Sequence, residues 1–550
     1  MRYNFAELFA AIAAEIPERD CVIFRDRRLS YADIADRSNR LANLLLAHGV
    51  TIHRPRADLQ PWESGQDHVA LYLHNGNEYL EGMIGAATAR AASFNVNYRY
   101  VEAELSYLLD DASARAIIYH ARFAPVLGAI LGELRQTPAL LLQVADESGN
   151  ALLSGALDYE EALAASSADA PGLPLDANDL YIVYTGGTTG MPKGTLWPQA
   201  NIIESALASF LPPGMLDAPS LVEGVATVVA AERRVLMPLP PLMHAAAQWM
   251  AMSAFLTGGT TVFPDVVERL DPAAVWEIVD REAVQFTNLV GNAFATPMCD
   301  AFERGGYSGS SLQFVGVGGA VTSASVKERI LKLLPHVVVG DVAGSSETGS
   351  QLSNLSTSQA PATSGVFTPA SGTCIVDEDQ GRILAPGDPS TGWLARHSLI
   401  PLGYLGDRDK TERSFPMIDG HRVVLPGDRA RYLADGTIEL LGRDSVTINS
   451  GGEKIFAEEV EAALADHPAV KDVNVAGRPS DRWGQEVVAI IELRPGHAPT
   501  DEDLLAHAGK RLARYKLPKA IVRVDAVIRS PSGKADYGWA RKIAAEGLHA

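Results

Sequence analysis

Apolar positions in the N-terminal part of the chain follow two different spacings. They recur at helical spacing over residues 31–48, and Gly49 can end that helix in the left-handed conformation. They then recur at every second position over residues 69–73, which predicts a strand. The same patterns predict a surface loop at residues 51–66, a helix at residues 78–90 and a strand at residues 116–119. Such alternation, continued along the chain, predicts mixed or parallel sheets covered by helices.

The C-terminal part of the chain has a different pattern. It predicts a helix at residues 457–464 and strands at residues 470–475 and within residues 486–493. Thr500 and Asp503 have the spacing of a capping box, which predicts a helix with an apolar face that runs to Leu512. These elements indicate a small, separate α+β domain.

The chain has 550 residues, which favours two or more domains. We place one boundary near Gly442 and Arg443, so that residues 1–442 form a large domain and residues 443–550 a small one. Charged residues make up 21% of the chain and the formal net charge is -20, which disfavours binding to nucleic-acid phosphates.

Features of exported and membrane proteins are not evident in the sequence. The N-terminal residues do not have the pattern of a signal peptide, and no apolar run approaches the roughly 20 residues needed to span a bilayer. Cys21, Cys299 and Cys374 are far apart, with neither a CxxC pair nor His at ligand spacing. We therefore expect free thiols in a cytoplasmic protein, and neither a disulfide framework nor a zinc site.

A loop rich in glycine and threonine follows a predicted apolar strand at residues 180–184. The loop contains Thr185, Gly186, Gly187, Thr188, Thr189 and Gly190, and Lys193 follows. Glycines let backbone N–H groups approach a polyanion closely, while the hydroxyls add donors and the lysine adds positive charge. The loop therefore predicts phosphate binding.

The surroundings of Lys193 distinguish this loop from a Walker A motif. Pro192 precedes the lysine and Gly194 follows it, where Walker A has Gly and then Ser or Thr. The run Tyr-Thr-Gly-Gly-Thr-Thr-Gly-Met-Pro-Lys-Gly instead resembles the phosphate loop of the adenylate-forming (AMP-binding) superfamily. That superfamily includes acyl-CoA synthetases, luciferases and the adenylation domains of peptide synthetases. Gly186 replaces the family's usual Ser, so the loop keeps its backbone donors and loses one hydroxyl.

The resemblance covers essentially the whole chain and implies a fold. That fold is α/β, with a large N-terminal domain of mixed sheets layered with helices and a small mobile C-terminal α+β domain. Within the phosphate loop, the resemblance implies catalytic roles for Thr188 and Lys193 and nucleotide binding by Thr185, Gly186, Gly187, Thr189 and Gly190.

Two further segments follow in the family's order. Residues 316–320 resemble the glycine-rich segment that lies against adenine and the acyl pocket, and residues 341–348 resemble the family's Tyr-Gly-x-Thr-Glu. The resemblance implies nucleotide binding by Gly318, Gly319, Ala320, Asp341, Ala343, Gly344, Ser345 and Ser346. Ala343 stands where an aromatic residue usually stacks on adenine. Glu347 stands for the catalytic acid that holds Mg²⁺, a hard cation suited to carboxylate oxygens.

Four positions in the last part of the chain complete the resemblance. Asp428 in Pro-Gly-Asp matches the family's Thr-Gly-Asp, which implies binding to the ribose hydroxyls. Arg443 opens the hinge and is implied to contact ribose or phosphate. Gly452 matches the segment that lines the pantetheine tunnel, and Lys534 matches the near-C-terminal lysine that bridges carboxylate and α-phosphate during adenylation.

The pivot of the hinge is less well defined by the sequence. The family usually has Asp or Lys two residues after the arginine, whereas this chain has Ser445 with Asp444 beside it. Either residue can serve as the pivot on this pattern.

The wall of the acyl pocket is implied by the segment that ends in His244. Amino-acid-activating relatives carry an Asp there, but this chain has three alanines after His244 and no acid, so an amino acid is disfavoured as substrate. His244 resembles the gate residue of acyl-CoA synthetases; a histidine satisfied within the core is the alternative. The motifs are most similar to a bacterial group that acts on long-chain or sterol-side-chain carboxylates.

The implied function is an ATP-dependent carboxylate–CoA ligase (an acid–thiol ligase, AMP-forming). It forms an acyl-adenylate and then an acyl-CoA thioester from a carboxylic acid, ATP and coenzyme A, with Mg²⁺, and is compatible with a homodimer. Three alternatives remain from the sequence. One is an acyl-AMP ligase that delivers to a carrier protein, another is a non-catalytic nucleotide- or acyl-binding protein, and the third is an oxidative luciferase.

Overall fold

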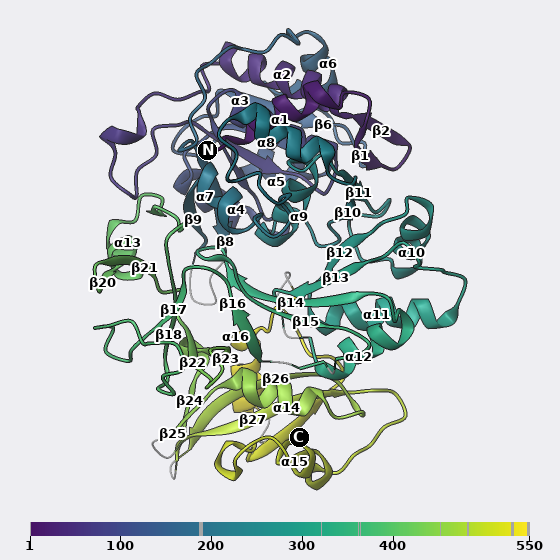
Figure 1. The fold of residues 1–550 in the computed structure, drawn as a ribbon, viewed down its shortest axis with the longest axis vertical. Helices are drawn as coiled ribbons and strands as arrows, with labels where there is room; N and C mark the ends of the chain where they lie inside the picture. The colour runs from purple at the N-terminus through teal and green to yellow at the C-terminus, as the bar shows by residue number, and fades with distance from the viewer. Residues whose placement is uncertain are drawn as a thin grey trace. The chain divides into compact units, whose positions relative to one another are not determined.

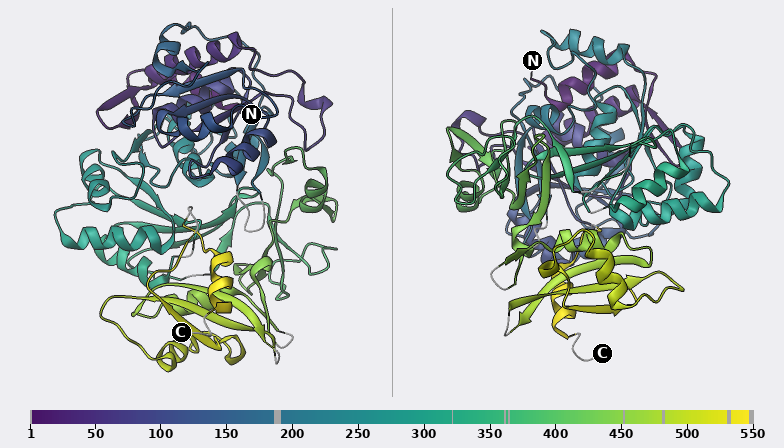
Figure 2. Two further views of the ribbon diagram at one scale, coloured as in Figure 1. Left: turned by 180° about the vertical axis from the view of Figure 1, so that it is seen from behind. Right: turned by 60° about the horizontal axis from the view of Figure 1, so that its bottom comes forward.

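The computed structural model describes residues 2–185, 191–320, 322–360, 362–363, 365–450, 453–480, 483–529 and 533–546. The chain packs into two compact units, whose elements are labelled in Figure 1 and seen from two further directions in Figure 2. The first unit comprises Met1–Asn288, Tyr307–Gln313 and Leu399–Phe415. The second comprises Leu289–Gly306, Phe314–Ser398 and Pro416–Ala550. The predicted division at residues 442 and 443 stays a prediction.

The first unit contains two sheets. One has the strand order β19-β9-β8-β4-β3-β5-β6-β7, and the other begins β2-β1-β11-β10-β12. The strands of the first sheet are β3 (His68–Tyr72), β4 (Ala92–Asn95), β5 (Ala114–His120), β6 (Leu140–Val144), β7 (Leu157–Asp158), β8 (Leu180–Thr185), β9 (Lys193–Pro198) and β19 (Gly403–Tyr404). Those of the second are β1 (Asp20–Phe24), β2 (Arg27–Ser30), β10 (Val235–Met237), β11 (Thr260–Phe263) and β12 (Phe286–Leu289).

Helices of the first unit cover these sheets. They are α1 (Phe5–Glu15), α2 (Tyr31–Ala47), α3 (Asn77–Thr88), α4 (Glu102–Asp111), α5 (Ala124–Ile130), α6 (Tyr159–Ala164), α7 (Gln199–Ser205), α8 (Leu221–Ala230), α9 (Ala245–Phe255), α10 (Pro272–Arg281) and α13 (Arg408–Ser414). The central strand β3 is buried on both faces: Val69 and Leu71 join one core with α2 and α3, while Ala70 and Tyr72 join another with α4 and α5. Parallel strands covered on both faces are the architecture that the alternating pattern predicts.

The predicted helix at residues 31–48 is confirmed as α2, and its start is encoded locally. Ser30 Oγ accepts from the backbone N–H of Asp33, and the Asp33 carboxylate accepts from the backbone N–H of Ser30. Gly49 follows with φ +71, the left-handed conformation expected of a residue that ends a helix. The predicted helix at residues 78–90 is confirmed as α3, and the predicted strands at residues 69–73 and 116–119 as β3 and β5.

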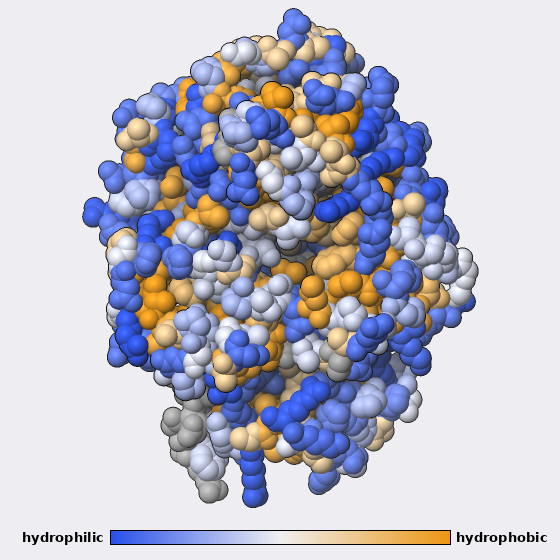
Figure 3. All heavy atoms as spheres, viewed as in Figure 1, coloured by the Kyte–Doolittle hydropathy of each residue, from blue (hydrophilic) through white to orange (hydrophobic). Residues whose placement is uncertain are grey.

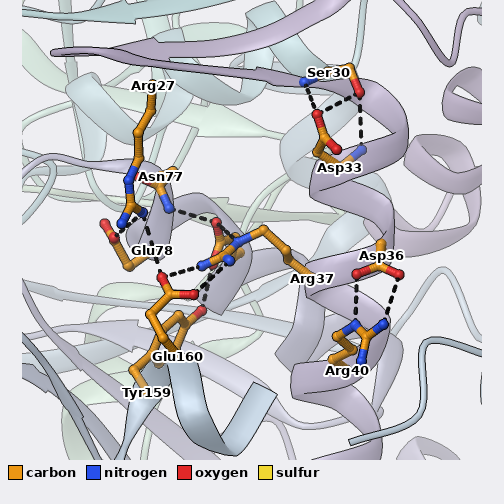
Figure 4. Close-up of polar contacts among 11 residues, drawn as sticks. Arg27, Ser30, Asp33, Asp36, Arg37, Arg40, Asn77, Glu78, Tyr159 and Glu160 are labelled. Atoms are coloured by element: carbon orange, nitrogen blue, oxygen red, sulfur yellow. Dashed lines mark hydrogen bonds and ion pairs between the residues drawn. The ribbon is translucent and has the colours of Figure 1, made fainter. Parts of the chain in front are cut away.

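A buried ionic network joins α2, α3 and α6, and Figure 4 shows it in close-up. Glu81 is fully buried, and its carboxylate accepts from Arg37 Nε at 2.8 Å and from Arg37 Nη2 at 3.1 Å. Asn77 Nδ2 and the Tyr159 hydroxyl also donate to Glu81, each at 2.7 Å. Glu160 accepts two further hydrogen bonds from Arg37. The buried charge of Glu81 is therefore both paired and hydrogen-bonded, the condition under which such burial is tolerated.

The second unit contains two further groups of strands. The first group has the order β13-β14-β15-β16-β23-β22-β18-β21-β20 with β17 paired to β18, and the second is β25-β24-β27-β26 with β28 paired to β27. The first group is β13 (Phe314–Gly318), β14 (Val338–Ser345), β15 (Gly349–Ser356), β16 (Val366–Pro369), β17 (Thr373–Val376), β18 (Gly392–His397), β20 (Met417–Ile418), β21 (His421–Val424), β22 (Asp428–Tyr432) and β23 (Ile438–Arg443). The second is β24 (Ile448–Ser450), β25 (Glu453–Ile455), β26 (Val470–Ser480), β27 (Gly484–Leu493) and β28 (Ala520–Val524).

The C-terminal strands form a two-faced sheet with its own cores. The helices of the second unit are α11 (Gly291–Arg304), α12 (Ala324–Leu333), α14 (Ala457–Ala465), α15 (Asp501–Ala508) and α16 (Tyr537–Glu546). Along β27, Val487 and Ala489 pack with α14 and α15, while Val488 and Ile490 pack with α16, whose position against the sheet can be followed in Figure 2. Because successive side chains of a strand point to opposite faces, α16 lies across the sheet from α14 and α15.

Much of the surface drawn in Figure 3 is hydrophilic, and the three thiols are buried. On the face drawn in Figure 3, hydrophilic residues cover much of the surface, with hydrophobic residues dispersed among them. Cys21, Cys299 and Cys374 are buried and free. No helix in the described ranges combines the length and apolar character needed to cross a membrane.

Candidate functional site

The predicted phosphate loop connects two paired strands of the first unit. β8 and β9 are antiparallel, and Thr185 lies directly opposite Lys193. This pairing holds the two ends of the loop side by side. Five predicted nucleotide-site residues, Gly186, Gly187, Thr188, Thr189 and Gly190, lie outside the described residues.

Lys193 has a defined electrostatic environment at the base of the loop. Its Nζ lies 3.1 Å from Asp407 Oδ2. Burial alone would lower the pKa of the Lys193 ammonium, but the hydrogen bond and charge of Asp407, together with Tyr107 and Asp111, raise it above its ordinary value. Lys193 therefore remains a cation at physiological pH, as phosphate binding requires.

His244 lies at the N-terminal end of α9, where its backbone is extended and the helix begins at the next residue. Its side chain is half-buried, and the alanines that follow it form the first turn of α9. The predicted acyl-site residue therefore sits at a strand-to-helix connection, directly after the segment that follows β10. Its role as a gate stays a prediction.

Two different reasons explain the glycines at the end of β13 in the second unit, backbone crowding at Gly318 and a left-handed conformation at Gly319. A side chain on Gly318 would begin 2.5 Å from the carbonyl oxygen of Val342 on the neighbouring strand β14. Gly319 has φ +73, a conformation that glycine adopts without strain, and Ala320 follows it. β13 and β14 are parallel, so this glycine turn and the end of β14 meet at the same edge.

Glu347 lies in the tight turn between β14 and β15. The Ser345 N–H donates to Thr348 Oγ1 at 2.9 Å, and the Glu347 N–H donates to Ser345 Oγ at 3.2 Å. Arg396 donates from Nη1 to the carbonyl oxygens of Thr348, at 2.6 Å, and Ser350, at 3.1 Å. The turn that carries Glu347, together with Ser345 and Ser346, is thus fixed by its own hydroxyls and by a buried arginine.

Gly344 and Ala343 lie where the β14–β15 pairing changes register. A side chain on Gly344 would collide with the carbonyl oxygen of Gly349, so this position requires glycine. Ala343 packs against the core of the neighbouring strands, which contains Leu352. The hairpin itself therefore requires Gly344.

Asp341 makes a buried ion pair that the sequence did not reveal. Lys327 Nζ lies 2.8 Å from Asp341 Oδ2 and also donates to the carbonyl oxygen of Thr363. Burial raises the pKa of Asp341, and the charge of Lys327 opposes that rise. The only available signal was a lysine on the buried stripe of α12, next to Val326 and at helical spacing from Ile330. The Asp341 carboxylate is thereby engaged in fixing β14 to α12.

Four predicted residues of the second unit form one electrostatic group. Asp428 begins β22 and lies opposite Arg443, which ends β23, and Arg443 Nε donates to Asp428 Oδ1 at 3.3 Å. Burial raises the pKa of Asp428, Arg443 counteracts the rise, and the negative charge of Glu347 adds to it. The structure thus brings the ribose-binding candidate, the hinge arginine and the predicted Mg²⁺ ligand into electrostatic contact.

Lys534 completes this group. The residue keeps exposed surface, but the protein atoms around its ammonium lower its pKa, as does the positive charge of Arg443. Glu347 and Asp428 act in the opposite direction. Residues that lie far apart in the sequence, two acids and two bases, therefore act on one another electrostatically, as a set suited to bind an anion and a metal together.

The predicted hinge and the predicted Mg²⁺ ligand both belong to the second unit. Asp444 and Ser445 lie in a 3₁₀ turn, Asp444–Val446, and Gly452 lies outside the described residues. No three His, Cys, Asp or Glu side chains converge within the described ranges as a metal-binding group. A single carboxylate such as Glu347 nevertheless fits Mg²⁺, which is commonly held by one or two carboxylates plus the phosphates of a nucleotide.

Family models match two parts of the chain. The model described as "AMP-binding enzyme" matches residues 9–404, and the model described as "AMP-binding enzyme C-terminal domain" matches residues 459–534. The first match spans more than half of the chain and contains the phosphate loop, His244 and Glu347. The second ends at Lys534.

Relatives and solved structures resemble the chain over nearly its full length. A medium-chain acyl-CoA ligase of Mycobacterium avium is 52% identical over 98% of this chain and 97% of its own. A 3-oxocholest-4-en-26-oate–CoA ligase of Rhodococcus rhodochrous is 36% identical over 98% of this chain and 96% of its own. The crystal structure of an anthranilate CoA ligase with anthranoyl-AMP has TM-score 0.82 at 20% identity, covering 100% of this chain and 98% of its own. The last similarity confirms the expected fold class.

Proposed function

The chain belongs to the AMP-binding enzyme family, and we propose that it is an AMP-forming acid–CoA ligase that converts a medium-chain carboxylic acid to its CoA thioester. The observation that carries this proposal is the group of Glu347, Asp428, Arg443 and Lys534 in the second unit. All four are positions that the family uses for nucleotide and metal, and a binding protein without chemistry would have no need to retain the lysine and the acids together.

The proposed reaction has two displacements. A carboxylate oxygen attacks the α-phosphorus of ATP and pyrophosphate leaves, which gives an acyl-adenylate. The thiolate of coenzyme A then attacks the acyl carbonyl and AMP leaves, carrying the bridging oxygen. The carboxylate and the triphosphate of ATP are both anions. The protein must therefore supply positive charge that reduces their repulsion in the first step.

We assign the first displacement to the predicted cations and hydrogen-bond donors. The phosphates would be bound by Lys193, Thr185 and the loop residues Gly186, Gly187, Thr188, Thr189 and Gly190. Lys534 would bridge the substrate carboxylate and the α-phosphate. Mg²⁺, held by Glu347, would supply charge neutralisation at the phosphate oxygens.

The remaining predicted residues would position the nucleotide. Asp428 would accept hydrogen bonds from the ribose hydroxyls, and Arg443 would hold both Asp428 and the ribose or phosphate. The backbone around the tight turns would line the adenine and acyl sites, through Gly318, Gly319, Ala320, Ala343, Gly344, Ser345 and Ser346. Asp341 would help through its ion pair with Lys327, because this pair holds β14, the strand that carries Ala343, Gly344 and Ser345.

The second displacement requires a different arrangement of the small domain. We propose that residues 443–550 turn relative to residues 1–442 between the two steps, with Asp444 or Ser445 as pivot. That motion would withdraw Lys534 and bring Gly452 to the pantetheine arm of coenzyme A. The free, buried thiols agree with the reducing cytoplasm, where we place the enzyme.

The acid is assigned from similarity and from His244. The relative at 52% identity is named for medium-chain acyl groups, and relatives at 34–36% identity are named for medium- and long-chain fatty acids, a sterol-derived acid or both. His244 and the alanines after it offer no acid to bind an ammonium group, which favours an apolar acid. A long-chain or bulky sterol-side-chain acid is the second candidate.

A panel of acids tests the substrate class. Pyrophosphate release would be measured with ATP, Mg²⁺ and octanoate, decanoate, palmitate, benzoate or 3-oxocholest-4-en-26-oate, each with and without coenzyme A. The proposal predicts the highest kcat/KM for octanoate or decanoate and a thioester mass that depends on coenzyme A. A maximum at palmitate or the sterol acid would replace the assigned substrate. Adenylate accumulation without thioester would indicate transfer to a carrier protein.

A further inference from the structure

The chain holds Lys193 by contacts that the family resemblance does not assign. Lys193 is the first residue of β9 and lies opposite Thr185, so its ammonium leaves the sheet at the base of the phosphate loop. Gly194 follows it, and a side chain there would collide with the Tyr184 ring, 2.7 Å away. The backbone at the base of the loop is therefore fixed on both strands.

Asp407 presents its carboxylate to Lys193 from a segment that is itself paired with β9. Tyr404 of β19 lies opposite Thr195, and the Leu405 N–H donates to the carbonyl oxygen of Gly194 at 2.8 Å. Asp407 is also the N-cap of α13, because its Oδ1 accepts from the Lys410 N–H at 3.0 Å. Its two oxygens thus have different partners, the helix end for Oδ1 and the Lys193 ammonium, 3.1 Å away, for Oδ2.

A second group acts on Lys193 from α4. Tyr107 influences the Lys193 ammonium electrostatically, and its hydroxyl lies 3.4 Å from Asp111 Oδ1. Asp111 in turn accepts from the Tyr184 hydroxyl at 2.8 Å. Burial and the Asp111 charge raise the pKa of Tyr107, so the phenol stays protonated at neutral pH. The groups that face the ammonium are therefore one carboxylate in contact, one neutral phenol and a second carboxylate behind it.

We propose that Asp407 is a positioning residue for ATP binding: it holds the Lys193 ammonium, with Tyr107, at the base of the phosphate loop. This proposal rests on the proposed function, in which that loop binds the phosphates of ATP. An ammonium has three N–H donors, so its contact with Asp407 leaves donor capacity for a phosphate oxygen.

Fixing the Lys193 ammonium before ATP binds outweighs the competition between Asp407 and phosphate for that ammonium. A lysine side chain loses rotamer entropy when it is fixed, and Asp407 and Tyr107 restrict it before ATP arrives. Lys193 and Asp407 are 29% and 25% exposed, so solvent weakens the attraction that a phosphate would have to overcome. Asp407 therefore acts on ATP affinity through the geometry of Lys193.

The test is the isosteric variant Asp407→Asn. Asparagine caps a helix as well as aspartate does, so α13 keeps its N-cap while the ion pair is lost. Affinity for Mg·ATP would be measured by calorimetry, which needs no acid substrate, and KM for ATP by pyrophosphate release. Tyr107→Phe removes the phenol hydroxyl, and Glu412→Gln removes an exposed ion pair on the same helix as the matched control.

We expect Asp407→Asn to weaken ATP binding about fivefold, the effect of losing one partly exposed ion pair. The alkaline limb of kcat/KM for ATP should move to lower pH, because Asp407 raises the pKa of Lys193. In a Lys193→Met background, Asp407→Asn should have no further effect, and Glu412→Gln should match the wild type. Thioester formation from supplied acyl-adenylate should be unchanged.

Two results would overturn the role of Asp407. Unchanged ATP affinity in Asp407→Asn would mean that the carboxylate serves only as the cap of α13. Tighter ATP binding would mean that Asp407 competes with phosphate for Lys193. Wild-type enzyme that does not bind Mg·ATP at all would instead refute the proposed function, so the two failures are distinguishable.

Discussion

Glu458, in the first turn of α14, accepts a hydrogen bond through Oε1 from the backbone N–H of Arg443 at 3.2 Å. Its Oε2 packs directly over Gly442, against the position where a side chain would begin. Gly442 has φ +124, which only glycine adopts without strain. The Glu458 carboxylate therefore packs against Gly442 at the junction between β23 and the C-terminal elements.

Gly442→Ala should therefore destabilise the protein by two effects, backbone strain and collision with Glu458. We expect a loss of about 2–4 kcal/mol, seen as a fall in Tm. Gly436→Ala is the matched control, because Gly436 has φ +83 but nothing near its missing side chain. It should show the strain alone, about 1–2 kcal/mol. Equal shifts in the two variants would show that Glu458 does not restrict Gly442.

Buried carboxyls around α14 predict how stability depends on pH. Burial raises the pKa of Glu461 to about 8, with the charge of Glu458 adding to the rise, and burial raises that of Glu458 to about 7. Between the ordinary value of 4.5 and these values, the folded chain keeps protons that the unfolded chain has lost. Stability from these groups is therefore complete below pH 4.5 and declines as pH rises to about 8.

Glu461→Gln should flatten that decline, since glutamine is neutral throughout and can still accept from the Val475 N–H as Glu461 does at 2.8 Å. Tm would be followed from pH 5 to 8. Glu502→Gln, on the exposed first turn of α15, is the control and should leave the slope of the wild type. A wild-type Tm that rises steadily over this range in parallel with that of Glu461→Gln would contradict the assignment.

Arg37→Met tests the buried network of the first unit. Removal of the guanidinium leaves the fully buried Glu81 without its cation, and breaking a buried pair in this way costs about 3–5 kcal/mol. Arg408→Met removes an exposed pair, with Glu412, and should leave the free energy of unfolding close to that of the wild type. Chemical denaturation of both variants measures the difference. Similar losses would mean that other groups compensate the Glu81 carboxylate.

The sequence predicts elements well where the signal is local. Thr500 and Asp503 do form the capping box that begins α15, and the strands at residues 470–475 and 486–493 are confirmed as parts of β26 and β27. The same helix is shorter than its apolar pattern suggests, because it ends at Ala508 before Gly509, and Leu512 lies beyond it. The apolar pattern alone does not show at which residue the backbone leaves the helix.

Side-chain partners from distant segments could not be predicted from the sequence. Asp341 is read from its motif as a nucleotide-site residue, yet its partner Lys327 follows no motif. Arg396, which holds the turn of Glu347, and Asp407, which holds Lys193, likewise come from segments without a motif of their own. Their identity depends on which strands become neighbours, and a single sequence does not specify that.

Lys534→Ala separates the two steps of the proposed reaction. Loss of the ammonium should slow adenylation by about 10²–10³-fold, the usual effect of removing one preorganised donor. Thioester formation from supplied acyl-adenylate should change little, because Lys534 has no role in that step. Lys542→Ala, an exposed lysine of α16, is the control for both half-reactions. Equal loss of both steps would show that Lys534 supports the fold or a shared binding site.

The measurement that tests the central claim most directly is the fate of carboxylate oxygen. The enzyme would be given ATP, Mg²⁺, coenzyme A and octanoate labelled with ¹⁸O in the carboxylate, and the products analysed by mass spectrometry. An AMP-forming acid–CoA ligase must release octanoyl-CoA, pyrophosphate and AMP that carries one ¹⁸O, because the bridging oxygen leaves with AMP. Label in inorganic phosphate together with ADP would indicate an acyl-phosphate route and contradict the account.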